Sequence, residues 1–504
     1  MIRYTGILLA SGLLLSVTAA AQNETDALRF GELSSGATAR SISLGGAGGS
    51  YGGDFSSLSI NPAGLGVYRS SEVMITPTLR LNSARSTYFG QDTRDNNAKM
   101  GISNFGVVFS TAKKGKDYTK SDWKAFSTGL GYNRVADLNS AVTYTGTNDQ
   151  SSITDIFSAD ALQNGITQDL VPPLGFFGWE GYLLDAGYAS IPRQQILNNG
   201  GDLLQSKSWE SKGGIDEWSF SLGGNYKEQL LLGISLDLVS YKFDRDTHFR
   251  ESDESGNNNN DFDYLSYNEY LTTSGVGFNA KLGAIYVVND RFRFGAAFHT
   301  PTWSVFTDDM DYDLTTNTEN LKNRTSQGDR APETYVQPDQ PYTFDYSLRT
   351  PWHALLSATA FFGQNGFITA DYEYVDYASM KYDFGDPPSE YERSVNQAIK
   401  DTYTGGHNLR IGVEGRKDHF MGRLGFAYHS SPLQRSADFY GQSLDVSAGI
   451  GARLNAFFID LAYRYRFKKS SDFAYPLLAS GVVTGIGDTQ YGNSLLALTL
   501  GLKF

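Results

Sequence analysis

Apolar and polar residues alternate along the C-terminal end of the chain. In the final stretch, SLLALTLGLKF, the apolar side chains occupy every second position: Leu496, Leu498, Leu500, Leu502 and Phe504. A period of two with one apolar face is the pattern of a β-strand that has lipid or a protein core on one side. The stretch FFIDLAYRYRF, residues 457–467, repeats the pattern, and its charged residues all share one parity. That parity is therefore expected to face water.

Similar stretches recur along most of the chain and predict about fourteen strands. The candidate strands are 72–84, 100–112, 123–134, 214–226, 230–243, 268–288, 291–301, 342–363, 366–378, 403–416, 419–430, 442–455, 456–467 and 491–504. An even number of antiparallel strands is typical of a bacterial single-chain barrel. The expected fold class is therefore all-β, a transmembrane antiparallel barrel that occupies residues 71–504.

The connections between these strands alternate in length. Tight turns such as ND at 289–290 and GQNG at 363–366 alternate with long polar loops at 135–213, 244–267, 302–341 and 468–490. Short periplasmic turns and long extracellular loops distinguish the two ends of an outer-membrane barrel. A soluble β-sandwich or propeller also alternates apolar with polar residues, but it does not need this asymmetry.

The composition supports the barrel and excludes several classes of protein. The chain has 504 residues with 31 Tyr, 31 Phe and 54 Gly, and its mean hydropathy is -0.34. No segment after the N-terminus has the roughly eighteen uninterrupted apolar residues of a spanning helix, whereas the polar lumen face of a barrel lowers the average hydropathy. The net charge of -13 argues against a nucleic-acid partner. Because the chain contains no Cys, it has neither disulfides nor thiolate metal ligands.

The N-terminus is expected to direct export. Arg3, the apolar run 6–17, and Ala19 with Ala21 match a signal peptide over residues 1–21, cleaved before Gln22. Residues 22–70 follow, rich in small residues and poor in charges, and they cannot form a core of their own. A fourteen-stranded barrel has a lumen too wide for its own side chains to fill. We therefore predict that this segment lies inside the barrel as a plug.

The same segment resembles a known family. ELSSGATARSISLGGAGGSYGGDFSSLSINPAGLG looks like the N-terminal hatch of the long-chain fatty acid transporters (FadL/TodX type), with Asn61, Pro62 and Ala63 after a Gly-rich run and Asp54 upstream. RFGAAFHTPTWS and RLGFAYHSSPL resemble recurring strand ends of that family. The terminal Phe resembles the signal that the barrel-assembly machinery recognises. The resemblance implies uptake of hydrophobic molecules, a hatch that shifts, and a side opening near a kinked strand.

The loop at 135–213 is the candidate for ligand capture. Apolar residues recur there at helical spacing in SSITDIFSADALQNGITQDL, so the loop is predicted to be partly helical. The segment that follows has five candidate ligand-binding residues: Phe176, Phe177, Trp179, Tyr182 and Leu183. Exposed apolar area of this kind suits a landing site for an amphipathic ligand. The alternatives are a self-packed cap over the barrel mouth and an interface with a protein partner.

Charged residues on the inward parity are expected in the lumen. This set is Lys281, Arg293, His299, Arg349, His353, Asp371, Glu373, Arg410, Glu414, Arg423, His429, Arg453, Asp460, Arg464 and Arg466. Most of them are expected to pair across strands and to hold the hatch. A ligand carboxylate needs one cation beside an apolar pocket, and His299, Arg349, Arg464 and Arg466 lie toward the outer half of the predicted strands.

No enzymatic constellation is present in the sequence. The six His lack metal-ligand spacing, the Gly-rich run lacks the Lys-Ser/Thr of a phosphate loop, and Gly-x-Ser-x-Gly is missing. We therefore expect a non-enzyme without catalytic residues, metal or cofactor, a monomer in contact with outer membrane lipid and a hydrophobic small-molecule ligand. Two other hypotheses remain open: a scaffold subunit of a protein-secretion machine, and a passive porin.

Overall fold

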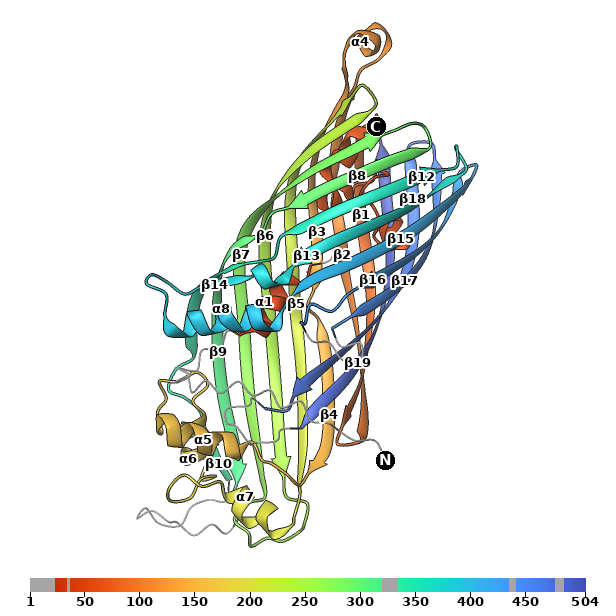
Figure 1. Cartoon of the computed structure of the whole chain (residues 1–504). Coiled ribbons are helices and arrows are strands. Elements are labelled where there is room, and N and C mark those ends of the chain that lie inside the picture. The colour runs from red at the N-terminus through yellow and green to blue at the C-terminus, as the bar shows by residue number, and fades with distance from the viewer. Residues whose placement is uncertain (1–22, 34–36, 320–332, 435–440, 476–484) are drawn as a thin grey trace.

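A computed structural model shows a closed antiparallel β-barrel with the N-terminal segment inside it (Figure 1). The structure describes residues 23–33, 37–319, 333–434, 441–475 and 485–504. The predicted signal peptide, residues 1–21, lies outside the described residues. The C-terminus and helix α4 (Gly115–Lys120) mark one end of the barrel, and helices α5 to α7 cover the other.

The barrel wall consists of fourteen transmembrane strands, as the sequence predicts. Some of them are interrupted, so the strands carry nineteen labels: β1 Glu72–Tyr88, β2 Gln91–Ala112, β3 Trp123–Asp137, β4 Ser140–Asn148, β5 Leu203–Tyr226, β6 Leu230–Ser252, β7 Tyr264–Val287, β8 Phe292–His299, β9 Trp303–Asn317, β10 Glu333–Val336, β11 Tyr342–Arg349, β12 His353–Phe361, β13 Gly366–Asp376, β14 Lys381–Asp383, β15 Gly405–Lys417, β16 Phe420–His429, β17 Ser443–Leu454, β18 Phe457–Phe473 and β19 Ile486–Lys503. Pairing of β1 with β19 closes the barrel. The short β10 pairs with the end of β9.

Four wall strands are interrupted near their middle: β3 with β4, β8 with β9, β11 with β12, and β13 with β14. The sequence predicts 342–363 as one strand, but Pro351 separates β11 from β12, and Pro301 likewise separates β8 from β9. Proline cannot donate a ladder hydrogen bond, which accounts for a break at these two positions. Side chains of β12 face the lumen at odd positions and those of β11 at even positions, so the break shifts the inward parity by one residue.

The extracellular loops are shorter than the sequence predicts because the strands extend well beyond the membrane. The connection predicted at 85–99 is mostly strand, with a two-residue turn at Phe89 and Gly90. The loop predicted at 135–213 shrinks to 149–202, since β4 and the start of β5 occupy the remainder. Outside the bilayer the outward face of a strand no longer needs apolar side chains, and the inward face under the cap loop mixes polar with apolar residues, so the apolar alternation that reveals a strand is lost there.

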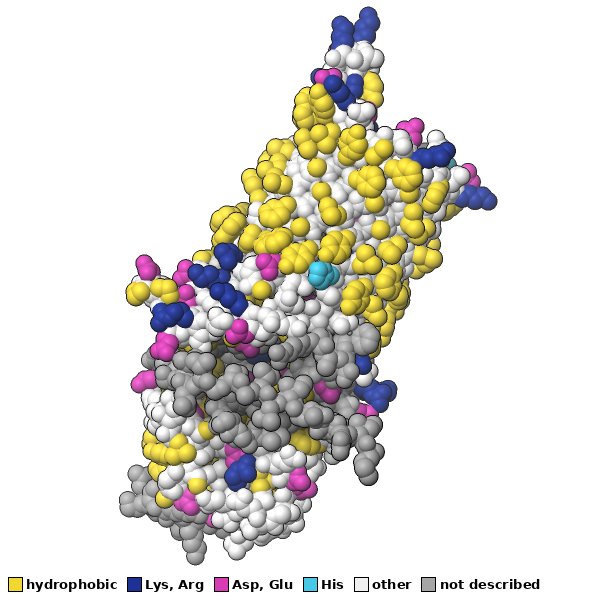
Figure 2. Space-filling view, viewed as in Figure 1, with side chains coloured by type: hydrophobic (Ala, Val, Ile, Leu, Met, Phe, Trp, Pro, Cys, Tyr) yellow, Lys and Arg dark blue, Asp and Glu magenta, His cyan; other side chains and the backbone are white. Residues whose placement is uncertain are grey.

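The outer surface of the barrel carries a continuous apolar belt. Figure 2 shows hydrophobic side chains covering the barrel between the α4 end and the level of helix α8 (Glu390–Thr402). Exposed belt residues include Leu238, Phe278, Leu356 and Ile450. A closed barrel with such a belt spans a lipid bilayer, and the protein is located in the outer membrane of a Gram-negative bacterium. Among the described helices, none is both long and apolar enough to cross a membrane.

The N-terminal segment forms short helices inside the barrel, and we call residues 23–70 the hatch. Its elements are α1 Glu24–Gly31, α2 Ala39–Ser43, α3 Ser57–Ile60 and the 3₁₀ helix η1 Pro62–Val67. Local caps explain these helices: Asn23 forms a capping box at α1, and the Thr38 side chain caps α2. Most of the hatch is buried, although its own helices are too short to form a core. The lumen wall therefore supplies the surface against which it packs.

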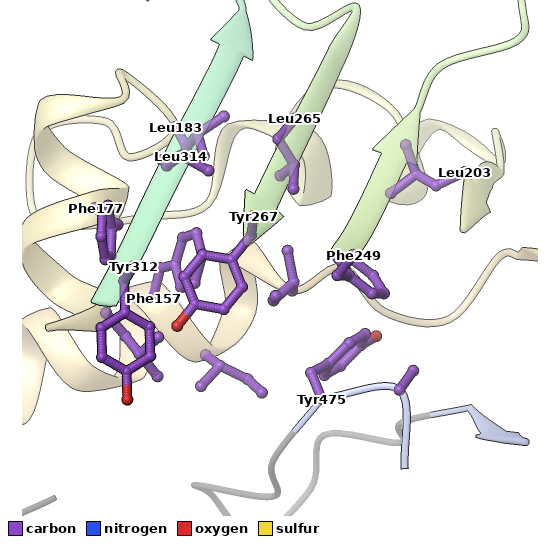
Figure 3. Packing of buried hydrophobic residues seen from close by; sticks show 14 of the residues in the cluster. Phe157, Phe177, Leu183, Leu203, Phe249, Leu265, Tyr267, Tyr312, Leu314 and Tyr475 are labelled. Carbon is purple, nitrogen blue, oxygen red and sulfur yellow. The ribbon is translucent and has the colours of Figure 1, made fainter. Parts of the chain in front are cut away.

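The loop 149–202, which we call the cap loop, folds over the extracellular end of the barrel. It contains α5 Thr154–Asn164, α6 Leu174–Glu180, α7 Ile191–Gln195 and the 3₁₀ helix η2 Leu197–Asn199. Its apolar side chains pack onto the strand ends, where Figure 3 shows Phe157 and Phe177 of the loop beside Tyr267 and Tyr312 of the wall. This apolar cluster also includes Tyr475 from the last extracellular loop.

Helix α8 takes the place of a strand in the wall. It follows β14 and the 3₁₀ helix η3 (Tyr377–Ser379) and lies beside α1 in Figure 1. β14 pairs with β11 on one edge. On its other edge the Asn396 side chain accepts from the Tyr382 amide at 2.8 Å and donates to the Tyr382 carbonyl at 2.9 Å. The helix thus satisfies the backbone of an otherwise open strand edge.

Candidate functional site

The Asn-Pro-Ala turn of the hatch is held from both sides. The Asn61 carboxamide accepts from the Ala63 amide at 3.1 Å, which caps η1, and donates to the Gly49 carbonyl at 2.7 Å within the hatch. The same nitrogen lies 3.3 Å from the Ala296 carbonyl of β8 and 3.4 Å from the Ala284 carbonyl of β7. The Asn61 side chain is therefore bonded to backbone on both sides. They tie one hatch turn to two wall strands.

A row of glycines in the wall receives this turn. Gly223, Gly233 and Gly283 are direct register partners on β5, β6 and β7. A Cβ atom on Gly283 would lie 1.9 Å from the Asn61 Oδ1, and one on Gly233 would lie 2.2 Å from the Pro62 carbonyl carbon. Only glycine allows the two backbones to approach this closely. The sequence does contain this signal, as glycines on the inward parity of three neighbouring strands, but its partner is visible only in three dimensions.

Charged groups anchor the hatch to the opposite part of the wall. The Arg40 guanidinium binds both Glu414 oxygens, at 2.9 and 3.1 Å, and Glu414 also accepts from Arg423 at 2.6 Å. Burial lowers the pKa of Arg40, but Glu414, together with Tyr51 and Asp54, raises it above its ordinary value. The Asp371 carboxylate accepts from the Gly48 amide at 2.8 Å. These contacts agree with the prediction that lumen charges hold the hatch.

Asp54 organises the hatch internally. Its carboxylate accepts from the Thr38 hydroxyl at 2.9 Å and from the Ser56 amide at 2.9 Å. The Ser56 hydroxyl in turn accepts from the Thr38 amide at 2.9 Å. Asp54 therefore joins the start of α2 to the turn before α3, and it contacts the hatch rather than the wall. Pro62 and Ala63 are buried at the start of η1.

An aromatic cluster fills the lumen on the extracellular side of the hatch. Phe30 of α1 stacks on Phe306 with ring centroids 4.9 Å apart and meets Tyr241 edge to face at 5.8 Å. We call Phe30 and the wall residues around it the lumen aromatic cluster: Tyr241, Phe243, Phe306, Tyr346 and Tyr382. These side chains pack against one another and give the lumen an apolar surface at this level.

The four predicted ligand-binding cations differ in their surroundings. His299 faces the lumen, and its Nε2 lies 3.0 Å from the Ile60 carbonyl of the hatch. Arg466 is neutralised by Asp445, with two contacts of 2.7 Å. The lumen position predicted for Arg349 is wrong: its side chain is exposed on the outer face because the break at Pro351 shifts the inward parity.

Arg464 is the lumen cation with the weakest compensation among these candidates. Its nearest carboxylate oxygen, on Asp445, is 3.9 Å away, and within the described residues its Nε has no hydrogen-bond partner. Arg80, separated from Arg464 in the strand register by Leu495, binds Asp137 at 3.3 Å. Buried polar groups without partners are uncommon in native proteins and mark places where water or a ligand is bound.

Further unpartnered polar groups line the same side of the lumen. In the described part of the chain, buried side-chain atoms without a hydrogen bond occur in Thr78, Asn104, Asn133, Ser447 and Asn493. These residues lie on neighbouring wall strands from β17 through β19 to β3. This side of the lumen is thus polar and incompletely satisfied, whereas the lumen aromatic cluster occupies another side.

The strand ladder is interrupted next to these groups. β2 and β3 are paired from Ala112 and Ala125 up to Asn104 and Asn133, and the ladder ends there. Beyond that point β2 continues to pair with β1, while β3 and β4 pair with β5. Asn104 and Asn133 are both fully buried. The wall therefore has a seam between β2 and β3 that only side chains and a few isolated bonds cross.

The predicted landing residues belong to the cap loop. Phe177 and Leu183 are buried in the apolar cluster of Figure 3, whereas Phe176, Trp179 and Tyr182 are partly exposed. Trp179 meets Tyr188 edge to face at 5.8 Å. The loop thus packs on itself and on the barrel mouth, as the cap alternative predicts. Phe176, Trp179 and Tyr182 remain accessible at its surface.

Glu251 holds the cap loop to the barrel from the extracellular end of β6. The outward positions of β6 are polar or charged from Lys242 onward, so Glu251 lies beyond the apolar belt. Its carboxyl group accepts from the Ser152 hydroxyl, from the Ile153 amide at 3.3 Å and from Gln205 at 2.7 Å. Burial raises the pKa of Glu251 to about 7, against the opposing effect of the Ser152 and Gln205 hydrogen bonds.

Within the described residues, no group of three or more His, Asp or Glu side chains is arranged to hold a metal ion. The sequence matches no family model and no curated protein. The structure is similar to that of a Pseudomonas aeruginosa FadL homologue, with a TM-score of 0.57, 15% identity, and coverage of 94% of this chain and 99% of the other. It is also similar to the Pseudomonas putida toluene transporter TodX, with a TM-score of 0.52, 13% identity, and coverage of 93% of this chain and 99% of the other. For the CymD monoaromatic hydrocarbon channel the TM-score is 0.51, the identity 12%, and the coverage 93% of this chain and 97% of the other. The chain shares their fold.

Replacing Gly283 by Ala should loosen the hatch without preventing barrel assembly. The new methyl group collides with the Asn61 carboxamide, and overpacking of this kind costs roughly 1–3 kcal/mol. We expect faster hydrogen exchange in residues 49–66 and unchanged heat-modifiable migration of the barrel. Gly422→Ala is the matched control because its Cβ meets no atom within 4 Å. Equal hydrogen exchange in the two variants would contradict the close contact between Asn61 and Gly283.

The cap loop should open more readily as the pH rises. The buried Glu251 carboxyl keeps its proton up to about pH 7, whereas the exposed group ionises near its ordinary pKa of 4.5. The closed loop therefore has its full stability below pH 4.5. Between pH 4.5 and pH 7 the equilibrium constant for opening increases by about tenfold per pH unit. Hydrogen exchange of residues 150–196, corrected for its intrinsic pH dependence, measures this opening.

The variant Glu251→Gln is the control for that titration. Its neutral carboxamide can accept from the Ile153 amide and from Gln205 through its oxygen and donate to the Ser152 hydroxyl through its nitrogen, so the loop should remain closed and its opening should no longer depend on pH in this window. A pH dependence that persists in Glu251→Gln would assign the titration to another group.

Proposed function

We propose that the protein transports hydrophobic or amphipathic small molecules into the cell across the outer membrane. The observation that carries this proposal is the seam at Asn104 and Asn133, which lies at the border between the polar side of the lumen and its apolar cluster. Val135 and Ala136, two and three residues after Asn133 on β3, belong to the apolar cluster that contains Phe30. A molecule bound in the lumen therefore has an apolar path to the point where the ladder between two wall strands ends.

The hatch supports uptake through the wall rather than along the barrel axis. Its turns fill the lumen at the level of the wall glycines, and Arg40 and Asn61 fix it to different strands. A passive porin needs a continuous water path, which a packed hatch disfavours. A hydrophobic ligand leaving sideways into the bilayer avoids this obstacle, because the lipid beside the seam is a favourable environment for it.

The cap loop is the proposed site of ligand capture. Phe176, Trp179 and Tyr182 present partly exposed aromatic area next to the buried cluster of Figure 3. Opening of the loop gives a ligand access to the barrel mouth, and the lumen aromatic cluster then offers it a second apolar surface. The FadL homologue, the toluene transporter and the monoaromatic hydrocarbon channel of the same fold agree with this ligand class.

Arg464 is the proposed anchor for an acidic ligand. It is an incompletely compensated cation in a lumen wall that also contains apolar groups. A carboxylate bound there would gain charge-assisted hydrogen bonds that a neutral hydrocarbon cannot form. The seam and the lumen aromatic cluster suit either kind of ligand. Arg464 is the feature that favours an acidic ligand over a neutral hydrocarbon.

A reversible cross-link at the seam tests the route. The chain has no native Cys, and Asn104 and Asn133 are register partners, so Asn104→Cys with Asn133→Cys should form a disulfide on oxidation. We expect uptake of a long-chain fatty acid or toluene by whole cells to fall several-fold on oxidation and to recover on reduction.

The matched control is Ser110→Cys with Ser127→Cys, which forms a disulfide between the same two strands within the intact ladder. Ser110 and Ser127 are register partners, and their hydroxyls are 3.0 Å apart. Oxidation of this control should leave uptake unchanged. Unchanged uptake with the seam cross-linked would refute exit at this position. Wild-type uptake no greater than that of cells lacking the protein would refute transport itself.

Replacing Arg464 by Gln tests the ligand class. If the ligand is an acidic amphiphile, the loss of a charge-assisted bond weakens binding of a long-chain fatty acid by about tenfold or more, while binding of toluene stays unchanged. Arg453→Gln removes a different lumen cation, one that already binds Asp460 at 3.0 Å, and should affect neither ligand. Equal binding of the fatty acid by wild type and Arg464→Gln would exclude Arg464 as its anchor.

A further inference from the structure

Two cations face each other on the outer surface of the barrel. Arg349 of β11 and Lys381 of β14 are direct register partners, and both side chains are exposed. Their neighbours Leu348 and Tyr382 are buried in the lumen, which fixes the outward direction of the pair. Like charges directly opposite each other on adjacent strands are destabilising. An anion between them would convert this repulsion into attraction.

The described part of the protein provides no carboxylate within salt-bridge distance of either cation. Arg349 uses one nitrogen, Nη2, to donate to the Ser379 carbonyl at 3.0 Å, which holds the guanidinium in place and leaves its other N–H groups outward. Two other exposed cations of the extracellular half are compensated within the protein: Arg85 lies 2.5 Å from Asp92, and Lys212 lies 3.3 Å from Glu210.

The pair lies at the level of the outer leaflet headgroups. Arg349 is in register with Trp303, which is exposed on the same outer face. Trp352, three residues further along the chain, donates its indole N–H to Asp376 at 3.0 Å and packs near Tyr374. A ring of Trp and Tyr marks the boundary between acyl chains and headgroups in membrane proteins. The two cations are therefore next to lipid headgroups rather than free in bulk water.

Helix α8 extends this basic surface. Its Glu392 side chain is buried and accepts from the Phe384 amide at 3.0 Å, whereas Arg393 and Lys400 point outward. The bonds from Glu392 and Asn396 hold the helix along β14, and Arg393 donates to the Pro388 carbonyl at 2.7 Å. Figure 2 shows Lys and Arg side chains over β14 and α8, with Asp and Glu side chains among them, at the edge of the apolar belt.

We propose that Arg349 and Lys381 bind the phosphorylated headgroup of an outer-leaflet glycolipid, lipopolysaccharide. Phosphate oxygens match the planar donors of a guanidinium and the point charge of an ammonium group. The acyl chains of the same lipid then lie on the apolar belt around Trp303 and Leu356. This site faces away from the lumen and is independent of the molecule that the barrel transports.

Lipid binding by the purified barrel in lipid nanodiscs tests the proposal. The probes are lipid A with its phosphates, the same lipid after dephosphorylation, and inorganic phosphate. We expect wild-type protein to bind phosphorylated lipid A, and Arg349→Gln with Lys381→Gln to bind it at least tenfold more weakly. The exchanged pair, Arg349→Lys with Lys381→Arg, keeps both charges and should retain binding.

The matched control is Lys212→Gln with Lys242→Gln, which removes two exposed cations that have carboxylate neighbours. It should bind phosphorylated lipid A as wild type does. Equal binding by the Arg349 and Lys381 double variant, or equal binding of dephosphorylated lipid by wild type, would overturn the site. Binding of inorganic phosphate as tight as that of lipid A would assign the pair to a free anion instead of a lipid.

Discussion

The structure depends on filling a lumen that the wall cannot fill. Fourteen strands enclose a space wider than two opposing layers of side chains, and an empty lumen would leave the wall's inward charges in contact with water. The hatch solves this by backbone contact. At Gly233 and Gly283 the wall has no side chain at all, and the backbone of Pro62 and the carboxamide of Asn61 take that volume. Close packing of this kind fixes the position of a segment whose own helices are too short to be stable alone.

The same constraint explains how much could be predicted from the sequence. The alternation of apolar and polar residues in 457–467 reflects a strand with lipid on one face, and the number of strands followed correctly from it. Asn61 was identified through its motif. The wall surface that receives Asn61 was not identified, because the glycines at 223, 233 and 283 are far from Asn61 in the sequence. A single inward Gly could equally mark a bulge or a kink.

Two other differences between prediction and structure share one physical origin. Apolar and polar residues alternate along a strand only where its two faces lie in different environments. Past the bilayer the outward face of β5 and β6 is polar and the inward face, packed under the cap loop, mixes polar with apolar side chains, so these strands were predicted too short and the loops too long. At Pro351 the ladder is interrupted and the inward parity moves by one residue, which turned Arg349 from a predicted lumen cation into an outward one. A parity count is reliable only between breaks, and proline is the signal that a break is near.

The distribution of compensated and uncompensated charges separates structural from functional positions. Glu414 binds Arg40 and Arg423, and Arg466 binds Asp445, so these groups hold parts of the protein together. Among the described residues, Arg464 in the lumen has only the distant Asp445 carboxylate at 3.9 Å and no hydrogen bond to its Nε, and Arg349 on the outer face has no carboxylate partner. Keeping a cation without a counter-charge costs free energy, in the lumen by desolvation and on the outer face by repulsion from Lys381. An anion from outside the chain removes that cost at both places. The two positions therefore point to ligands of the same charge in different environments, one inside the barrel and one in the surrounding leaflet.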